Sequence, residues 1–145
     1  MGIILESLKN TGKTGVHMKD SKGVTQLIYP ILTIYVADYP EQCLVTCTKY
    51  GTCVKCCQTA NNLGDNQLTT PQTKKWTLQV IDNAKKKSKG SISKFHEYCM
   101  ERDVAGGIYT PFWKDLPFCD IHLTITPDIL HQLYQGVFKH VVGWC

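Results

Sequence analysis

The sequence lacks two kinds of segment that would decide where the protein resides. No apolar run approaches the roughly 20 residues that a membrane-spanning helix needs. No early stretch joins a basic start, an apolar run and a small-residue cleavage site. These absences argue against a membrane partner and against secretion, so we expect a nuclear or cytoplasmic protein.

A phosphate-binding loop of the nucleotide-hydrolase type is also missing. The tripeptide Gly12-Lys13-Thr14 matches the end of such a loop. The loop requires another glycine five residues before Gly12, and this chain has Ser7 there. We therefore reject nucleotide binding of that kind.

The composition suits one domain with an apolar core. The chain has 145 residues, of which 43% are hydrophobic, which is enough for one domain and short for two. The formal net charge is only +4, and much of the excess lies in one local stretch. That stretch contains Lys74, Lys75, Lys85, Lys86, Lys87, Lys89 and Lys94.

Within the lysine-rich stretch, apolar residues recur at helical spacing. Trp76, Val80 and Ile81 predict a helix over residues 72–87. Lysines near the end of this helix are candidate contacts to nucleic-acid phosphates, although a solvated helix face explains the same pattern. These candidates are Lys85, Lys86, Lys87 and Lys89.

Helical and strand patterns alternate along the chain and predict an α/β fold. A short helical pattern over residues 2–8 is followed by Gly12 and Gly15, which punctuate it. The apolar run over residues 27–37 is rich in Ile, Tyr and Val, but Pro30 interrupts it, so one continuous central strand is not expected. The run ends in Asp38, where a buried strand opens to solvent, a common place for a catalytic acid in α/β folds. An exposed strand end explains Asp38 equally well.

The last third of the chain predicts a strand followed by a helix. Residues 121–125 have the strand pattern, and Thr126 then suits the cap of a helix whose first position is Pro127. Asp128 and His131 lie three residues apart on that helix, so their side chains project from nearly the same face. Such a pair can bind a metal or orient a phosphate, and a simple capping role for Asp128 is the alternative.

The eight cysteines favour metal binding together with buried thiols, because nothing in the sequence indicates secretion. Cys53 and Cys56 are separated by two residues and fit one edge of a tetrahedral zinc site. Such a site needs two more ligands, and buried thiols without metal remain the alternative. The candidates for closure are Cys43, Cys47, Cys57, Cys119 and His131.

Several long motifs, taken together, resemble the Plavaka transposases, which are abundant in mushroom-forming fungi and related to the CACTA superfamily. The similarity runs from about residue 3 to the end of the chain. The motifs are Tyr29-Pro30-Ile-Leu, Tyr35-Val-Ala-Asp38-Tyr-Pro-Glu-Gln-Cys43-Leu, Cys53-x-x-Cys56, Pro111-Phe-Trp-Lys-Asp-Leu-Pro117, Cys119-Asp-Ile and Thr126-Pro-Asp-Ile-Leu-His-Gln-Leu-x-x-Gly-Val-Phe-Lys139.

The resemblance implies a ribonuclease-H-like core in which three carboxylates hold divalent cations, Mg or Mn, that activate water or a 3′ hydroxyl for attack on DNA. It makes Asp38 the second acid of the triad and gives Asp128 and His131 a supporting role as a D-x-x-H signature. Cys53 and Cys56 become structural zinc ligands. The implied partners are DNA and other transposase chains.

The resemblance also implies a single partial catalytic-core domain over residues 1–145. We expect core helix and strands over 1–42, a Cys-rich and Lys-rich insertion over 43–110, and an aromatic turn with the D-x-x-H helix over 111–145. The first acid of such families lies on earlier strands and the last acid downstream of the D-x-x-H helix.

We therefore expect a fragment or remnant of a DDE/D-type transposase that is inactive alone. The alternative is a zinc-stabilised module, domesticated from the transposase, that binds DNA or protein.

Overall fold

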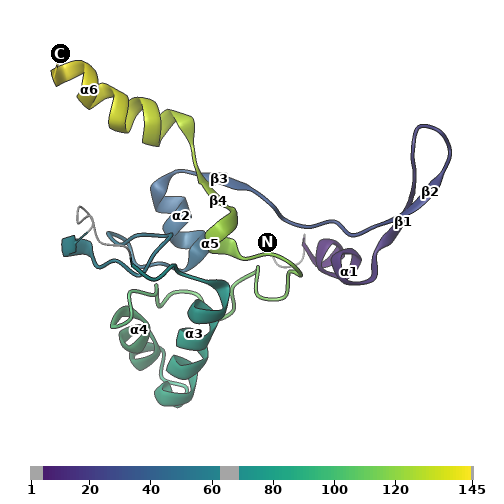
Figure 1. Cartoon of the computed structure of the whole chain (residues 1–145). Coiled ribbons are helices and arrows are strands. Elements are labelled where there is room, and N and C mark those ends of the chain that lie inside the picture. Colours follow the sequence, from purple (N-terminus) through teal and green to yellow (C-terminus); the bar gives the residue numbers. More distant parts are fainter. Residues whose placement is uncertain (1–4, 63–68, 145) are drawn as a thin grey trace.

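The computed structural model describes residues 5–62 and 69–144 as a mixture of helices and short strands, shown in Figure 1. This confirms the mixed α/β content predicted from the sequence. The elements are α1 (Glu6–Thr14), β1 (Val16–Lys19), β2 (Thr25–Ile28), β3 (Tyr35–Ala37), α2 (Tyr39–Thr46), η1 (Ala60–Asn62), α3 (Lys74–Ser88), α4 (Ile92–Met100), α5 (Ile121–Thr124), β4 (Ile125–Pro127), η2 (Ile129–Phe138) and α6 (Lys139–Trp144).

The four strands form two small sheets. β1 and β2 make an antiparallel hairpin in which Val16 lies opposite Ile28. β3 and β4 are parallel, although they are far apart in the sequence, and Ala37 lies opposite Pro127. As predicted from Pro30, the apolar run over 27–37 contributes to two separate strands.

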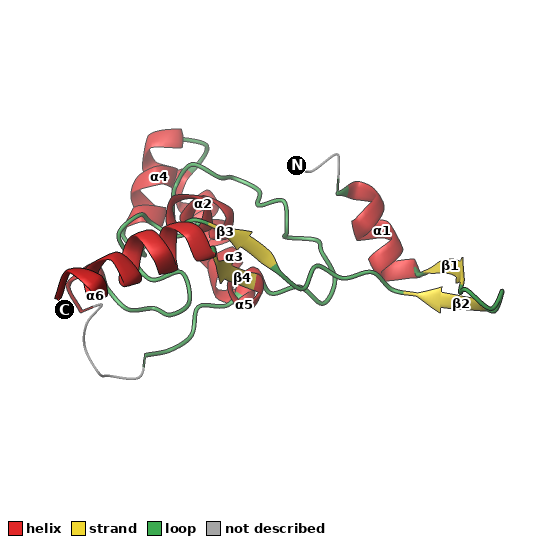
Figure 2. Cartoon of the chain, turned by 90° about the horizontal axis from the view of Figure 1, so that it is seen from above, coloured by secondary structure: helices red, strands yellow, loops and turns green. Residues whose placement is uncertain are grey.

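The core lies among α2, α3, α4 and α5. Its largest fully buried side chains include Trp113, Phe95, Ile81 and Ile121. The indole N–H of Trp113 donates a hydrogen bond to the carbonyl of Val45 in α2, with an N···O distance of 2.6 Å. Figures 1 and 2 show α1 and the β1–β2 hairpin to one side of this group of helices.

Two predictions for residues 121–128 were wrong in detail. Ile121–Thr124 form one helical turn instead of a strand, because the Asp120 carboxylate accepts a hydrogen bond from the His122 N–H at 3.1 Å and caps that turn. Thr126 does not cap the next helix. It pairs with Val36 in the parallel ladder, so the strand extends to Pro127 and Asp128 becomes the cap.

Of the two glycines predicted to punctuate the first helix, Gly15 ends α1 after Thr14, whereas the helix continues through Gly12. Gly12 is buried inside the helix and allows a close approach. A Cβ atom added there would lie 2.7 Å from Cγ of Pro117 and 2.9 Å from the carbonyl oxygen of Pro30. Glycine at this position therefore lets α1 lie against the loop that contains Pro117.

The apolar stripe of η2 and α6 is exposed. Leu133 is 53% exposed and Val137 is 59% exposed, and other apolar side chains of these helices behave similarly. Figure 1 shows this arm leaving the body of the molecule after β4. Within residues 5–62 and 69–144, no helix has the length and apolar composition needed to cross a membrane.

Candidate functional site

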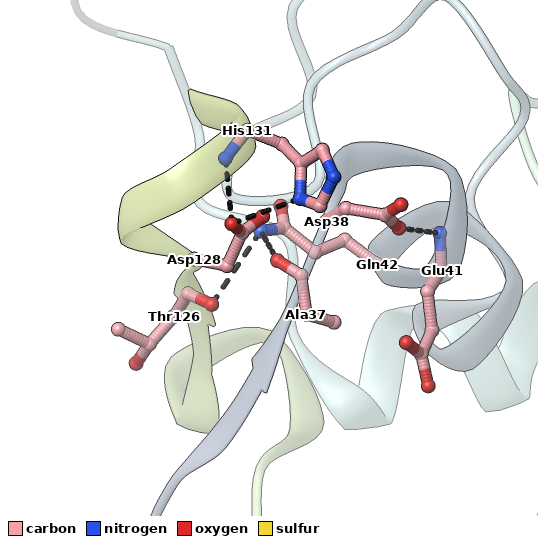
Figure 3. Close-up of polar contacts among 7 residues, drawn as sticks. All are labelled: Ala37, Asp38, Glu41, Gln42, Thr126, Asp128 and His131. Carbon is pink, nitrogen blue, oxygen red and sulfur yellow. Dashed lines mark hydrogen bonds and ion pairs between the residues drawn. The ribbon is translucent and has the colours of Figure 1, made fainter. Parts of the chain in front are cut away.

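The ends of β3 and β4 bring two aspartates to one edge of the parallel sheet. Ala37 and Pro127 lie opposite one another, so the next residues, Asp38 and Asp128, leave the sheet side by side. The Asp128 N–H also donates to the Ala37 carbonyl at 3.2 Å, which fixes the spacing of the two chains. Figure 3 shows both carboxylates at this edge. Residues 90 positions apart in the sequence thus share one site.

Asp38 is half-buried and caps helix α2. One carboxylate oxygen accepts a hydrogen bond from the Glu41 N–H at 3.0 Å. Pro40 lies in the first turn of the helix, where the missing N–H has no cost. The capping bond holds the carboxylate at the carboxyl end of β3, the position predicted for it from the sequence.

Asp128 and His131 interact directly, as their spacing predicted. Oδ1 of Asp128 accepts from the His131 N–H at 2.7 Å and lies 3.1 Å from Nδ1 of the His131 ring. The hydrogen bond from the His131 backbone holds the pKa of the Asp128 carboxyl below its usual value, so the group stays ionised. Oδ2 is buried and has no hydrogen-bond partner among the described residues.

Gln42 ties the two strands together and was not predicted from the sequence. Its side-chain N–H₂ donates to the Ala37 carbonyl at 2.8 Å and lies 3.5 Å from the Thr126 carbonyl. The side chain is 3% exposed and appears beside both aspartates in Figure 3. A glutamine inside a helix gives no sequence signal for this role, since its partners are fixed only by the fold.

The comparison with family models decides the family. A model described as Plavaka transposase matches residues 1–145, the whole chain. The chain belongs to the Plavaka transposase family. Neither a search of curated proteins nor a search of solved structures gave a match.

In this Plavaka transposase chain, the Cys53 and Cys56 thiols lie close enough to interact with one another. Burial raises the pKa of Cys53, whereas a hydrogen bond from Thr69 lowers that of Cys56. Residues 5–62 and 69–144 contain no group of three or more His, Cys, Asp or Glu side chains placed to hold a metal ion. Two cysteines are half of the ligands that a tetrahedral zinc site needs, and zinc binding stays a prediction.

The other candidate zinc ligands are spread over the molecule. A charge on Cys53 would raise the pKa of the Cys43 and Cys57 thiols. Cys47 is fully buried beside Cys99. Cys119 is buried, and His131 belongs to the Asp128 pair. None of these candidates joins Cys53 and Cys56 in a group of three within the described residues, so the remaining ligands stay open among them.

The loop between the two cysteines is anchored to the segment that leads to Asp128. The Lys55 ammonium donates to the carbonyls of His122 at 2.8 Å and Ile125 at 2.5 Å, where α5 ends and β4 begins. The His122 ring lies 2.8 Å from the Val54 carbonyl and 2.7 Å from the Thr77 hydroxyl. The loop, α3 and β4 are thereby held together.

We expect the buried His122 to make stability depend on pH. A carbonyl can only accept, so Nδ1 donates to Val54 and the neutral ring accepts from Thr77 at Nε2. Burial lowers the pKa of His122 below its usual value of about 6.5. The unfolded chain then binds more protons in acid, so stability is complete above about pH 6.5 and falls as the pH drops toward the folded pKa.

Urea unfolding of the wild type and of His122→Asn at several pH values measures this effect. The variant should lose about 1–3 kcal/mol of stability at neutral pH, because a buried partner is left unpaired, and should show a weaker acid dependence. Exposed His17 provides the matched control, His17→Asn. Equal acid dependence in His122→Asn and the wild type would show that His122 is not the titrating group.

The predicted nucleic-acid lysines lie at the end of α3 and differ in their surroundings. Lys85 is engaged, because its ammonium lies 3.6 Å from the Asp82 carboxylate and 5.0 Å from the centre of the Tyr109 ring. Lys86, Lys87 and Lys89 are exposed. Among the four, these three are the better placed to meet a phosphate.

Proposed function

We propose that this chain supplies part of the catalytic core of a metal-dependent DNA transposase with a ribonuclease-H-like fold. The observation that carries the proposal is the pairing of Asp38 and Asp128 at neighbouring ends of two parallel strands. Carboxylates clustered at one edge of a sheet are what such enzymes need to hold divalent cations against a phosphodiester bond. Membership of the Plavaka transposase family supports the same reaction, DNA cleavage and strand transfer.

The donor atoms at this edge suit a hard cation. Mg²⁺ and Mn²⁺ prefer carboxylate oxygens, and Oδ2 of Asp128 is buried without a partner among the residues described. In the proposed arrangement Asp38 is a direct ligand, and Asp128 with His131 supports the site. When bound, the metal would activate the attacking oxygen and stabilise charge on the phosphate.

The chain's own residues hold this edge in place for the metal. Gln42 and the Asp128 N–H bind the same carbonyl of Ala37, which keeps the strand ends in register. Within the described ranges, Asp38, Asp128 and His131 do not come together as a group of three that could hold a metal ion. We therefore propose that the chain is inactive alone and that the remaining acids come from another segment or chain of the transposase.

The proposed substrate is DNA, and a nuclear or cytoplasmic location stays a prediction. Lys86, Lys87 and Lys89 would contact phosphates and release counterions, so binding should weaken steeply as salt is raised. A binding module without cleavage, stabilised by zinc, is the second candidate. It is favoured by the Cys53–Cys56 pair and by these exposed lysines.

Manganese provides the test, because it broadens nearby NMR signals. We expect low Mn²⁺ to broaden the ring signals of His131 before those of exposed His17 and His96. Asp38→Asn should weaken this binding by roughly tenfold or more, the size typical of damaged metal sites. The chain alone should not cut DNA in Mg²⁺ or Mn²⁺.

Exposed Asp115, which makes no ion pair in the described part of the chain, gives the matched control Asp115→Asn. Uniform broadening of all histidines, or unchanged Mn²⁺ affinity in Asp38→Asn, would contradict the role of Asp38 as a ligand. Cleavage by the isolated chain would contradict the proposed inactivity.

A further inference from the structure

A cleft of about 320 Å³ lies between helices α3 and α4, away from the paired aspartates. This volume is within the range of about 300–1,000 Å³ that is usual for small-molecule sites. The cleft has aromatic, amide and charged side chains in its wall. They include Trp76, Gln79, Asn83, Lys87, Tyr98 and Arg102.

The aromatic and cationic groups of the cleft are available to a ligand. Trp76 and Tyr98 are half-buried, so each ring is held by the helices and still reaches the surface. The Lys87 ammonium lies 5.6 Å from the centre of the Tyr98 ring. Arg102 is the only arginine in the sequence.

Several polar groups here have no partner among the residues that the structure describes. Neither the Arg102 guanidinium nor the Trp76 indole N–H makes a hydrogen bond to any residue in the described ranges. No ion pair in those ranges involves Arg102 or Lys87. The wall also contains the carboxylate of Glu101, so its cations outnumber its anions by two to one. Two cations beside two aromatic rings match a group that is flat and apolar on its faces and negatively charged at its edge.

We propose that this cleft holds one unpaired nucleobase of the DNA strand. The base would stack on Trp76 or Tyr98, and its phosphate would lie near Lys87 and Arg102, as in other single-strand binding surfaces. The amides of Gln79 and Asn83 would meet the polar edge of the base. The proposal rests on the proposed function as a DNA transposase.

The surroundings of the cleft favour a strand of DNA over a free nucleotide. Exposed Lys86 and Lys89 continue the positive charge along the end of α3, beyond the cleft. The volume of the cleft suits one base. A base that is still paired would have to leave the duplex before it could enter. An enzyme reaches such a base most easily where it is already unpaired, since no stacking or pairing has to be broken.

The test compares two labelled duplexes that differ only in one unpaired 2-aminopurine. Measured by fluorescence anisotropy on the full chain, the duplex with the unpaired base should bind about tenfold more tightly, the size of one base–aromatic stack. The 2-aminopurine emission should fall on binding, because stacking quenches it. Trp76→Ala should remove both effects, and Trp76→Phe should keep most of the preference.

Two further variants separate binding from folding. Arg102 is exposed, so Arg102→Ala should fold normally and still weaken the unpaired duplex by a few-fold. Trp144, which is 81% exposed on α6, gives the matched control Trp144→Ala with no change. Circular dichroism of each variant checks that the helices are retained.

The outcomes distinguish the cleft from the wider function. Two results would contradict base binding in the cleft and leave DNA binding by the chain in place. One is equal binding of both duplexes. The other is a preference for the unpaired base that persists in both Trp76→Ala and Arg102→Ala. If neither duplex binds at low salt, both DNA binding by this chain and base binding in the cleft are contradicted. A preference that both variants reduce supports the proposal.

Discussion

Replacing Trp113 by alanine should cost this Plavaka transposase chain about 3–5 kcal/mol of its free energy of unfolding, the range observed for a large aromatic residue removed from a core. Trp113 is fully buried at the centre of the core. Its N–H is bonded to the carbonyl of Val45, which would be left without that partner in a buried position. Since whole domains are stable by only about 5–15 kcal/mol, the variant should lose a large share of its stability and melt at a clearly lower temperature.

This change should also disturb the acidic site, because Val45 belongs to the helix that Asp38 caps. Urea unfolding followed by circular dichroism measures the loss. Trp113→Phe keeps most of the apolar volume and removes the hydrogen bond, so it should cost less than Trp113→Ala. Exposed Trp144→Ala should leave stability within about 0.5 kcal/mol of the wild type. Near-equal stability of Trp113→Ala and the wild type would contradict the assigned core.

Local signals allowed the aspartate site to be predicted in outline. An apolar run that ends in an aspartate placed Asp38 at a strand end, and the three-residue spacing brought Asp128 and His131 together. The periodic apolar residues of the lysine-rich stretch predicted α3 to within two residues at its start and one at its end. These features depend on residues near one another in the chain.

Contacts between distant residues could not be predicted in the same way. That Asp38 lies beside Asp128 follows from the pairing of β3 with β4, and Gln42 gains its role only from that pairing. The strand predicted over 121–125 failed for a related reason. A single capping bond from Asp120, which also accepts the Lys74 N–H at 3.0 Å, turns the segment into a helix.

The anchored cysteine loop connects these distant parts. Lys55 lies between Cys53 and Cys56 in sequence and binds carbonyls at the start of β4, three residues before Asp128. Burial lowers the pKa of its ammonium, which still donates hydrogen bonds to several carbonyl oxygens. A change in the loop should therefore reach the aspartate site through β4.

Zinc should bind this loop at about one ion per chain, and loss of either thiol should abolish it. Zinc requires thiolates, and Cys53 and Cys56 provide two at the spacing of one tetrahedral edge. Other ligands must move to complete the site, and the candidates are Cys43, Cys47, Cys57, Cys119 and His131. Removing zinc with a chelator should lower Tm by about 5–10 °C, as expected for a ligand bound at roughly 100 times its Kd or more.

Metal analysis of purified protein, with melting curves before and after chelation, measures both effects. Cys53→Ser and Cys56→Ser should contain no zinc and should melt like the chelated wild type. The buried thiol Cys99 gives the matched control, since Cys99→Ser should keep its zinc. Zinc should also leave as the pH falls, because burial raises the pKa of Cys53 and favours its protonated form. If the purified wild type contains no zinc and its Tm does not change on chelation, the two thiols have no metal role. The hydrogen bonds of Lys55 and His122 would then be sufficient to hold the loop.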